Sequence, residues 1–150
     1  CVTYLSPNEF EAALISGLPL RADENGVDQG DLERVTERLC GLGIEKVMIT
    51  LGGNGSVLCD TDGMHRTACV KMPEVKDPTA AGDSFVAAFC TGITAGLPEG
   101  EALAFASHTA AITVSGMGAM PSLPTVEQVQ QLLRQRQYSG FDAAELDALK

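Results

Sequence analysis

The order of apolar and polar positions along the chain predicts strands that alternate with helices. Apolar or β-branched runs predict strands at Val2–Leu5, Lys46–Leu51, Ser56–Cys59 and near His65–Val70, the first of them buried. Apolar residues at helical spacing predict helices at about Pro7–Ile15, Asp28–Leu42, from after Gly82 to Ala95, Glu99–Val114 and Val126–Leu133, with a last one in the tail. This alternation is typical of the α/β class, and we expect a three-layer α/β/α fold with mixed strand pairing.

Turn and capping residues divide these elements. The segments Ser6–Glu9, Thr125–Gln128 and Asp142–Glu145 each place an acid or amide three residues after a capping residue, so we expect a helix to begin at each. In the tail, Phe141 is expected to pack on Leu146. The glycine-rich segment 52–55 predicts a hairpin turn, and residues 18–27 predict a polar loop.

Length and composition exclude several classes of protein. The chain has 150 residues, of which 45% are apolar, enough for one domain with a core. No apolar run approaches the roughly 18 residues of a membrane span, and a formal net charge of −10 argues against nucleic acid and anionic membranes. The cysteines are scattered, without a CxxC pair, so we expect neither disulfides nor zinc, and a location in the reducing cytoplasm.

The candidate chemistry is concentrated in the run Asp77–Phe85. Ala80, Ala81 and Gly82 have little or no side chain, so another molecule could approach the N–H groups at the helix start. Those groups lack intrahelical partners and lie at the positive end of the helix dipole, which suits an anion. Asp83 would lie beside that anion as a base, an arrangement that phosphoryl transfer to an alcohol needs. For a lone Gly-Asp pair, a plain helix start with an acid that favours the dipole would be the better interpretation.

The whole run resembles the signature of the PfkB (ribokinase-like) carbohydrate kinases, in which Asp-Thr-x-Gly-Ala-Gly-Asp is typical. Pro78 replaces the usual Thr and Ala80 replaces a common Gly, and both changes keep the cradle and the acid. The resemblance implies ATP-dependent phosphoryl transfer to a hydroxymethyl group of a sugar, with Asp83 as general base. It also implies an anion hole formed by the N–H groups of Ala80, Ala81, Gly82 and Asp83.

Asn8 and Glu11 lie three residues apart on one face of the first helix. By themselves they indicate a polar first turn with an acid near the positive end of the dipole. The pair also resembles the Asn-x-x-Glu motif of the PfkB family, which implies that Asn8 and Glu11 hold Mg²⁺ through its water shell.

The segment Thr50–Gly55 resembles the Thr-Leu-Gly strand end of the family, which implies that Thr50 and Gly52 contact ATP. A dinucleotide-binding fingerprint is the rival interpretation. It fails because Leu58 stands where a third glycine should be and no clear helix follows. A glycine hairpin alone would leave Thr50 unexplained.

The resemblance implies two further sites. An adenine pocket would include Ser107 and Gly118, although the family commonly has Asn at the position of Ser107. A K⁺ site beside the anion cradle would be formed by Asp77, Thr79, Thr113, Gly116, Gly118 and Ser122. His108, in contrast, shares a helix face with apolar residues and is better interpreted as a packed core histidine than as a catalytic one.

We interpret residues 1–150 as a single domain, the C-terminal nucleotide-binding and catalytic part of a PfkB-type kinase with a small-molecule sugar as acceptor. The upstream sugar-binding and lid region of the family has no counterpart here. Without its strands the sheet would expose an edge, which predicts aggregation, a homodimer or a complementary chain. Two alternatives stay open: a non-catalytic nucleotide-binding module and a nucleoside kinase of the same superfamily.

Overall fold

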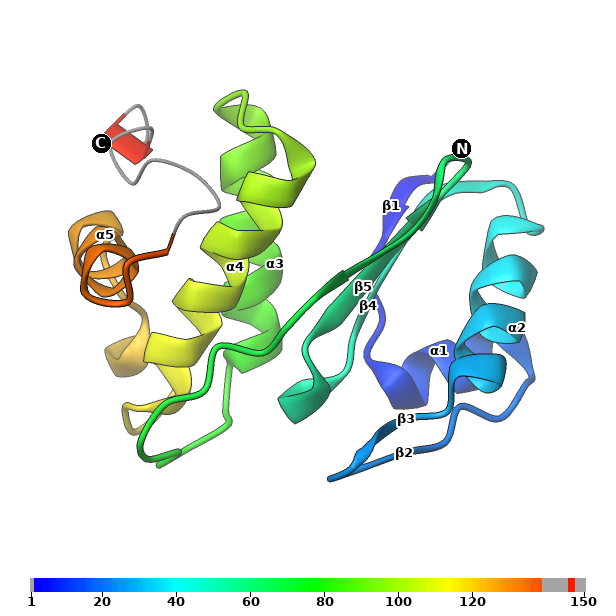
Figure 1. Ribbon diagram of the computed structural model, residues 1–150, viewed down its shortest axis with the longest axis horizontal. Coiled ribbons are helices and arrows are strands. Elements are labelled where there is room, and N and C mark those ends of the chain that lie inside the picture. The colour runs from blue at the N-terminus through cyan, green and yellow to red at the C-terminus, as the bar shows by residue number, and fades with distance from the viewer. Residues whose placement is uncertain (1, 139–145, 148–150) are drawn as a thin grey trace. The chain divides into compact units, whose positions relative to one another are not determined.

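A computed structural model describes residues 2–138 and 146–147. The chain forms two compact units, Cys1–Cys69 and Val70–Lys150. The described part of the first unit contains a mixed sheet, a small hairpin and two helices, and that of the second contains three helices (Figure 1). The expected α/β class is confirmed, whereas the single domain stays a prediction.

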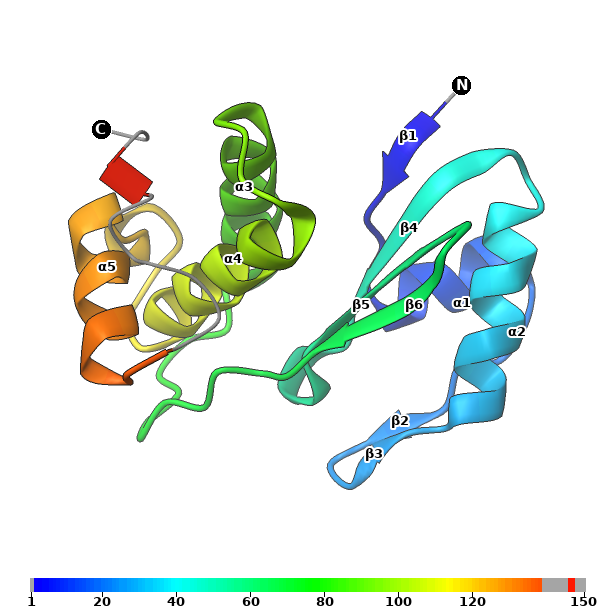
Figure 2. The ribbon, with the colours of Figure 1, turned by 45° about the horizontal axis from the view of Figure 1, so that its top comes forward.

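The first unit is built on a four-stranded sheet with the order β1-β4-β5-β6. Its strands are β1 (Val2–Leu5), β4 (Ile44–Thr50), β5 (Ser56–Asp60) and β6 (Gly63–Thr67). β1 runs parallel to β4, and the other neighbours are antiparallel (Figure 2). A parallel pair needs a long crossover, and the two helices of this unit lie in that crossover.

The core of this unit lies between the sheet and the helices α1 (Glu9–Ser16) and α2 (Gln29–Cys40). Its residues come from one face of α2, from α1 and from alternate positions of the strands, which point to the same side of a sheet. The fully buried members are Ala12, Leu32, Val35, Leu39, Val47, Ile49 and Val57. The apolar residues whose spacing predicts these helices and strands are therefore the residues that form the core.

β1 has the predicted bounds but is not buried. It forms one edge of the described sheet, pairing there only with β4, and Val2 is 47% exposed. The expectation of a buried strand is therefore wrong, because apolar β-branched residues do not reveal whether a strand has one neighbour or two. The open edge that the sequence predicts is present in the described sheet, and dimerisation through it stays a prediction.

Residues 18–27 are not the polar loop that the sequence predicts. They contain an antiparallel hairpin of two very short strands, β2 (Ala22–Asp23) and β3 (Gly26–Val27). Its base is closed by the N–H of Asp28, which donates to the carbonyl of Arg21 at 2.9 Å. Two-residue strands carry almost no periodicity, so the apolar pattern does not indicate them.

The second unit packs α3 (Ala81–Thr94), α4 (Glu99–Val114) and α5 (Val126–Gln135) (Figure 1). α4 has the predicted bounds, and the predicted capping box of Thr125 and Gln128 is confirmed. The buried apolar residues of the three helices include Phe85, Phe89, Leu103, Phe105, Val129 and Leu133. The predicted tail cap at 142–145 and the Phe141 contact lie outside the described residues.

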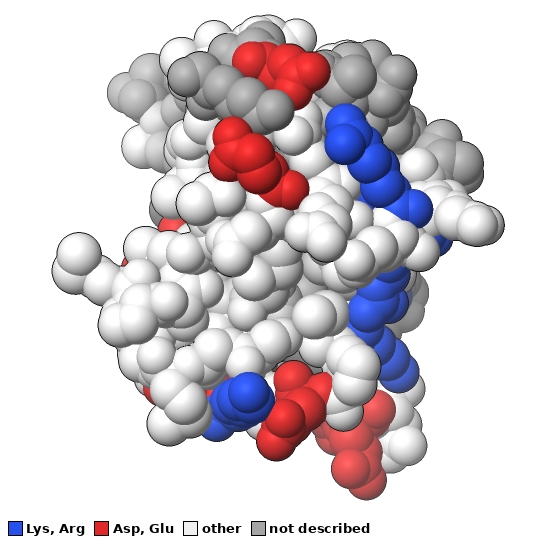
Figure 3. Space-filling view, turned by 90° about the vertical axis from the view of Figure 1, so that its left-hand side faces the viewer, with Lys and Arg blue, Asp and Glu red and all other residues white. Residues whose placement is uncertain are grey.

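Charged side chains are unevenly distributed on the face drawn in Figure 3. Most of the Lys and Arg drawn lie along one side of that face, another lies at its lower left, and Asp and Glu lie above and below a largely uncharged centre. No helix in the described ranges combines the length and the apolar character that spanning a membrane requires.

His108 is a packed core residue, as the sequence predicts. It is 3% exposed, its Nδ1 lies 2.8 Å from the carbonyl oxygen of Ala104, and its ring meets that of Tyr138 edge to face. Burial lowers the pKa of this imidazole, and the positive charge of Arg136 lowers it further. The folded protein therefore holds His108 neutral.

We expect this neutral histidine to make the protein less stable in mild acid. The ordinary pKa is 6.5, so the unfolded chain binds a proton at His108 below that pH, whereas the folded chain resists it. The contribution of the neutral His108 to the free energy of unfolding is present above pH 6.5 and is lost as the pH falls. Urea unfolding of wild-type and His108→Gln proteins between pH 7.5 and 5 measures it, and the variant should lose less stability on acidification.

The matched control is His65→Gln, which removes the exposed imidazole of β6 by the same substitution. If His108→Gln loses as much stability on acidification as the wild type, the prediction is wrong.

Candidate functional site

The run that carries the predicted chemistry forms a strained turn into α3. Ala80 is the N-cap residue of α3, with φ 63° and ψ 8°. This is the left-handed region, which costs an L-residue about 1–2 kcal/mol. The conformation is held on both sides, because Ala81 N–H donates to Pro78 O at 3.2 Å and Ser84 N–H donates to Ala80 O at 2.9 Å. The neighbouring hydrogen bonds therefore keep Ala80 in a conformation that glycine would adopt at less cost.

The turn leaves polar groups available at the start of α3. The N–H of Ala81 is already engaged, whereas the second and third helical residues, Gly82 and Asp83, lie in the first turn, where N–H groups have no intrahelical acceptor. Asp83 is exposed in the same turn. Two free N–H donors at a helix start can bind an anion, and the exposed carboxylate beside them can accept a proton.

Asp77 joins this turn to the loop after α4. Its Oδ1 accepts from Thr79 N–H at 2.9 Å, and its Oδ2 accepts from Gly118 N–H at 2.9 Å. The N–H groups of Lys76 and Asp77 both reach the carbonyl of Val114, at 2.8 and 3.3 Å. Hydrogen bonds from the side chain and N–H of Thr79, and from Gly118 N–H, lower the pKa of Asp77, so this carboxyl is ionised at neutral pH.

The structure also brings together the other residues of the predicted cation site. Gly116 N–H donates to Thr113 O at 3.1 Å, and a Cβ added at Gly116 would lie 2.7 Å from the Cβ of Ser122. The hydroxyls of Thr113 and Ser122 donate to main-chain carbonyls, at 3.0 and 2.8 Å. Only glycine fits at position 116, so the close approach of this loop to Ser122 depends on it.

The predicted adenine contacts lie in the same unit. Ser107 is in the middle of α4 and is 9% exposed, and Gly118 is in the loop that Asp77 holds. Gly118 has φ 77°, which favours glycine. The adenine pocket stays a prediction.

In the first unit, Asn8 and Glu11 cap helix α1. Asn8 Oδ1 accepts from the N–H groups of Phe10 and Glu11, both at 2.9 Å, and Glu11 Oε2 accepts from Asn8 N–H at 2.9 Å. This is a complete capping box. The prediction that Ser6 caps the helix is wrong, because Pro7 lies before the helix and its carbonyl accepts from Thr50 N–H at 3.0 Å.

Thr50 lies directly beside this capping box. It ends β4 and forms a parallel bridge with Asn8. The next residues turn back through a short 3₁₀ helix, Gly52–Asn54, into β5, which confirms the predicted hairpin turn. Gly55 has φ 88°, and a Cβ there would lie 2.1 Å from the carbonyl oxygen of Thr67. The structure thus brings Asn8, Glu11 and Thr50 together, with Gly52 two residues beyond.

The capping box is compatible with outer-shell binding of Mg²⁺. Glu11 is exposed and uses one carboxylate oxygen in the cap, so its other oxygen remains for a metal-bound water. Within the described ranges no three His, Cys, Asp or Glu residues are grouped closely enough to hold a metal directly.

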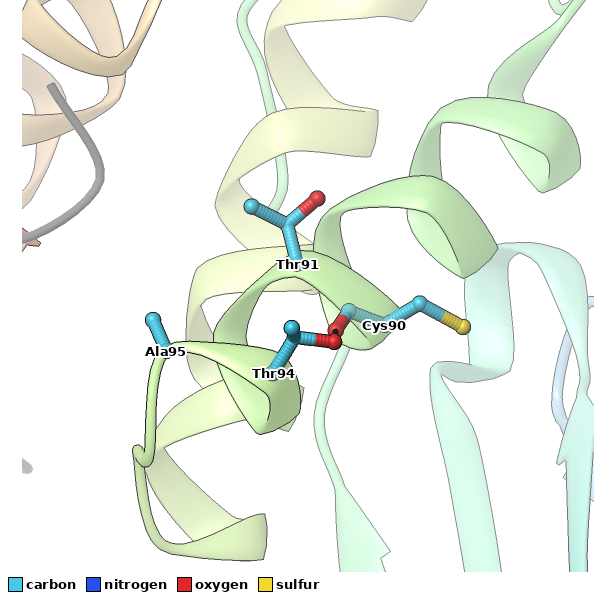
Figure 4. A pocket seen from close by; sticks show the side chains of 4 residues that line it. All are labelled: Cys90, Thr91, Thr94 and Ala95. Atoms are coloured by element: carbon cyan, nitrogen blue, oxygen red, sulfur yellow. Dashed lines mark hydrogen bonds between the residues drawn. The ribbon is translucent and has the colours of Figure 1, made fainter.

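A shallow hollow of about 400 Å³ lies on the C-terminal half of α3. The side chains of Cys90, Thr91, Thr94 and Ala95 line it (Figure 4). The hydroxyls of Thr91 and Thr94 donate to carbonyls one turn back in the helix, at 2.7 and 2.8 Å. Because these protons are used within α3, the hollow has little with which to select a ligand.

Three groups with a part in these sites are not predicted from the sequence: the carbonyls of Pro7 and Val114, and the side chain of Asn54. The carbonyls of Pro7 and Val114 carry no sequence signal, since every residue has one. Asn54 is missed as a contact to the β2–β3 hairpin, and its place between two glycines is the only hint.

Free N–H groups at a helix start with an adjacent carboxylate, on an α/β fold, are compatible with phosphoryl transfer. The model of the pfkB family carbohydrate kinases matches residues 1–126, and the chain belongs to this family.

Several relatives are named ribokinases, and another is named a nucleoside kinase. The ribokinase of Arabidopsis thaliana is 31% identical over 134 residues, covering 89% of this chain and 34% of the relative. That of Schizosaccharomyces pombe is 36% identical over 129 residues, covering 84% of this chain and 39% of the relative. The chain therefore spans less than half the length of these relatives.

Solved structures agree with this assignment. The structure of Arabidopsis thaliana ribokinase complexed with ribose and ATP superposes with a TM-score of 0.80 and 32% identity, over 88% of this chain and 41% of that one. Thermotoga maritima ribokinase gives a TM-score of 0.75 and 31% identity, over 87% and 42%. These neighbours confirm the ribokinase-like fold.

We expect the Asn8 cap to be needed for stability independently of any metal. Asn8→Ala should lower the free energy of unfolding by about 1 kcal/mol, because two N–H groups at the start of α1 lose their acceptor. Asn8→Asp keeps an acceptor oxygen and should stay within a few tenths of a kcal/mol of wild type. Urea unfolding without Mg²⁺ measures both, and equal stability of the two variants would contradict the capping role.

We expect relief of the Ala80 strain to stabilise the protein. Ala80→Gly should raise the free energy of unfolding by about 0.5–1 kcal/mol, because glycine adopts a positive φ at little cost. Ala81→Gly, one residue later in the helix, is the control and should lower it by up to about 1 kcal/mol. Thermal unfolding of the two variants tests this, and a destabilised Ala80→Gly protein would show that Ala80 is not strained.

Proposed function

We propose that this chain is the nucleotide-binding and catalytic part of a sugar kinase that transfers the γ-phosphoryl group of ATP to a hydroxymethyl group. One observation carries the proposal: the left-handed Ala80 turn leaves free N–H groups at the start of α3, with the exposed carboxylate of Asp83 in the same turn. Family membership, and relatives that are named ribokinases, support the same reaction class.

Asp83 acts as the general base in this proposal. Its carboxylate accepts the proton of the sugar hydroxyl as that oxygen bonds to the γ-phosphorus. The bond from the γ-phosphorus to the bridging oxygen breaks at the same time, and ADP leaves with that oxygen. A positioned base contributes typically 10²–10⁴-fold to such a step.

The N–H groups at the helix start stabilise charge on the phosphoryl group during transfer. Gly82 and Asp83 supply free donors, and Ala80 adds its N–H at the turn. Ala81 N–H already donates to Pro78 O at 3.2 Å, so its contribution would require that bond to be shared or exchanged. The anion hole thus rests mainly on Ala80, Gly82 and Asp83.

The remaining predicted residues bind the nucleotide and its ions. Thr50 offers a hydroxyl and Gly52 an open backbone to ATP, and Ser107 and Gly118 border the adenine. Asn8 and Glu11 orient the water shell of Mg²⁺, which neutralises phosphate charge when it is bound. A K⁺ ion would be held by Asp77, Thr79, Thr113, Gly116, Gly118 and Ser122, a set supported by the hydrogen bonds of Asp77 and by the close packing of Gly116 on Ser122.

We expect Asp83→Asn to abolish turnover while nucleotide still binds. The amide cannot accept the hydroxyl proton, so kcat should fall at least about 100-fold, whereas the dissociation constant of ATP should change by no more than a few-fold. The measurement is ADP release with Mg²⁺ and K⁺ on ribose, fructose, 2-keto-3-deoxygluconate and nucleosides. It should use this chain and the full-length product of its reading frame.

The matched control is Asp62→Asn, the same change at an exposed turn residue between β5 and β6. Near-normal turnover in Asp83→Asn would exclude Asp83 as the base. Turnover with nucleosides alone would indicate a nucleoside kinase, and ATP binding without any turnover by the unmodified protein would indicate a binding module.

A further inference from the structure

One side-chain contact joins the β2–β3 hairpin to the turn that follows Thr50. Asn54 Nδ2 donates to the main-chain oxygen of Asp23 at 3.0 Å, across 31 residues of sequence. The two views of the ribbon agree that the hairpin lies beside this turn (Figures 1 and 2). The contact therefore connects an element with no assigned role to the segment proposed to touch ATP.

The hairpin is anchored firmly enough to act as a support. The side chain of Asp31, on α2, is fully buried and accepts from Arg21 N–H at 3.1 Å and from Arg21 Nε at 2.6 Å. It also pairs with Arg34, and its own N–H donates to Asp28 Oδ1 at 2.9 Å. The Arg21 guanidinium lowers the pKa of Asp31 to about 2, so the carboxylate stays charged over the physiological range. Arg21, just before β2, and Asp28, just after β3, are thus both bonded to Asp31 of α2.

Leu51 is buried in the core and Gly55 packs against Thr67, but the main-chain hydrogen bonds between these two residues mostly close the turn on itself. Leu51 N–H donates to Gly55 O at 2.8 Å, and Asn54 N–H donates to Leu51 O at 2.9 Å, so these bonds only close the turn. At its start, Thr50 N–H is held by Pro7 O at 3.0 Å. Gly52, with φ 53°, lies between these points, at the position where a nucleotide would approach. Asn54 supplies the tether at the far end of the turn.

We propose that Asn54 is a positioning residue: by bonding to the Asp23 carbonyl it holds the Gly52–Gly55 turn on the anchored hairpin, in the conformation that receives the nucleotide. The nucleotide part of this assignment rests on the proposed function. An Asn that served only as a favourable turn former would influence stability and leave nucleotide affinity unchanged.

Asn54→Asp is the decisive variant, because it keeps the size of the side chain, removes the N–H donor and places a carboxylate against the Asp23 carbonyl. In the full-length protein we expect about fivefold weaker binding of a non-hydrolysable ATP analogue with Mg²⁺, the scale of one lost hydrogen bond. Hydrogen exchange at the amides of residues 52–55 should become faster by a similar factor. The urea midpoint should fall only by what the loss of this one hydrogen bond explains, because the core is untouched.

Asn25→Asp is the matched control. It makes the same charge change at an exposed residue of the same hairpin, where the N–H of Asn25, not its side chain, donates to Asp23 Oδ1 at 2.8 Å. We expect wild-type affinity and exchange in this variant. An equal loss of affinity in Asn25→Asp would mean that added negative charge, not the tether, weakens binding, and would overturn the proposal.

The two readouts separate this proposal from the proposed function. Unchanged exchange in Asn54→Asp overturns the tether whether or not nucleotide binds. Faster exchange with unchanged affinity overturns the positioning role. If the unmodified protein binds no nucleotide at all, the proposed function fails and the nucleotide role of Asn54 fails with it, while the exchange data still decide whether the tether exists.

Discussion

Main-chain polar groups that leave a helix or strand must find new hydrogen-bond partners, and this constraint shapes the candidate site residues of each unit. In the first unit, the Asn8 side chain takes the first N–H groups of α1, and Pro7 takes the N–H that ends β4. In the second unit, Asp77 takes N–H groups from Thr79 and Gly118. The residues that satisfy these groups are largely those to which the family resemblance gives a functional role.

The starts of α3 and α4 have no such side-chain acceptor, and the free N–H groups of α3 are the ones that the proposed function uses. At Ala80 the chain turns in a left-handed conformation, and the helix begins without a side-chain cap. A capping side chain would occupy the N–H groups that an anion needs, so the uncapped start of α3 leaves these groups available to one. The strain persists because neighbouring hydrogen bonds, from Ala81 to Pro78 and from Ser84 to Ala80, hold the turn.

Local signals explain why much of the fold is predictable from the sequence. Helix α4 and the cap of α5 are confirmed because apolar spacing and capping residues act within a few residues of sequence. The cap of α1 shows where local signals stop. Ser6 and Asn8 are both capping residues with an acid three positions later, and local rules do not choose between them. The pairing of Pro7 and Asn8 with Thr50 continues the strand register past Ser6, so the helix begins at Glu9.

The sequence by itself determined the periodic helices and strands, the glycine turn after Thr50 and the small-residue run before Asp83, because each follows from the side chains of neighbouring residues. Only the tertiary structure decided that β1 lies at a sheet edge, that Asp31 anchors a hairpin, and that Asp77 reaches Gly118, 41 residues away. It likewise decided that Asn54 bonds to Asp23. The physical reason is that most of these contacts end on main-chain groups, which every residue carries, so only the folded chain selects which of them meet.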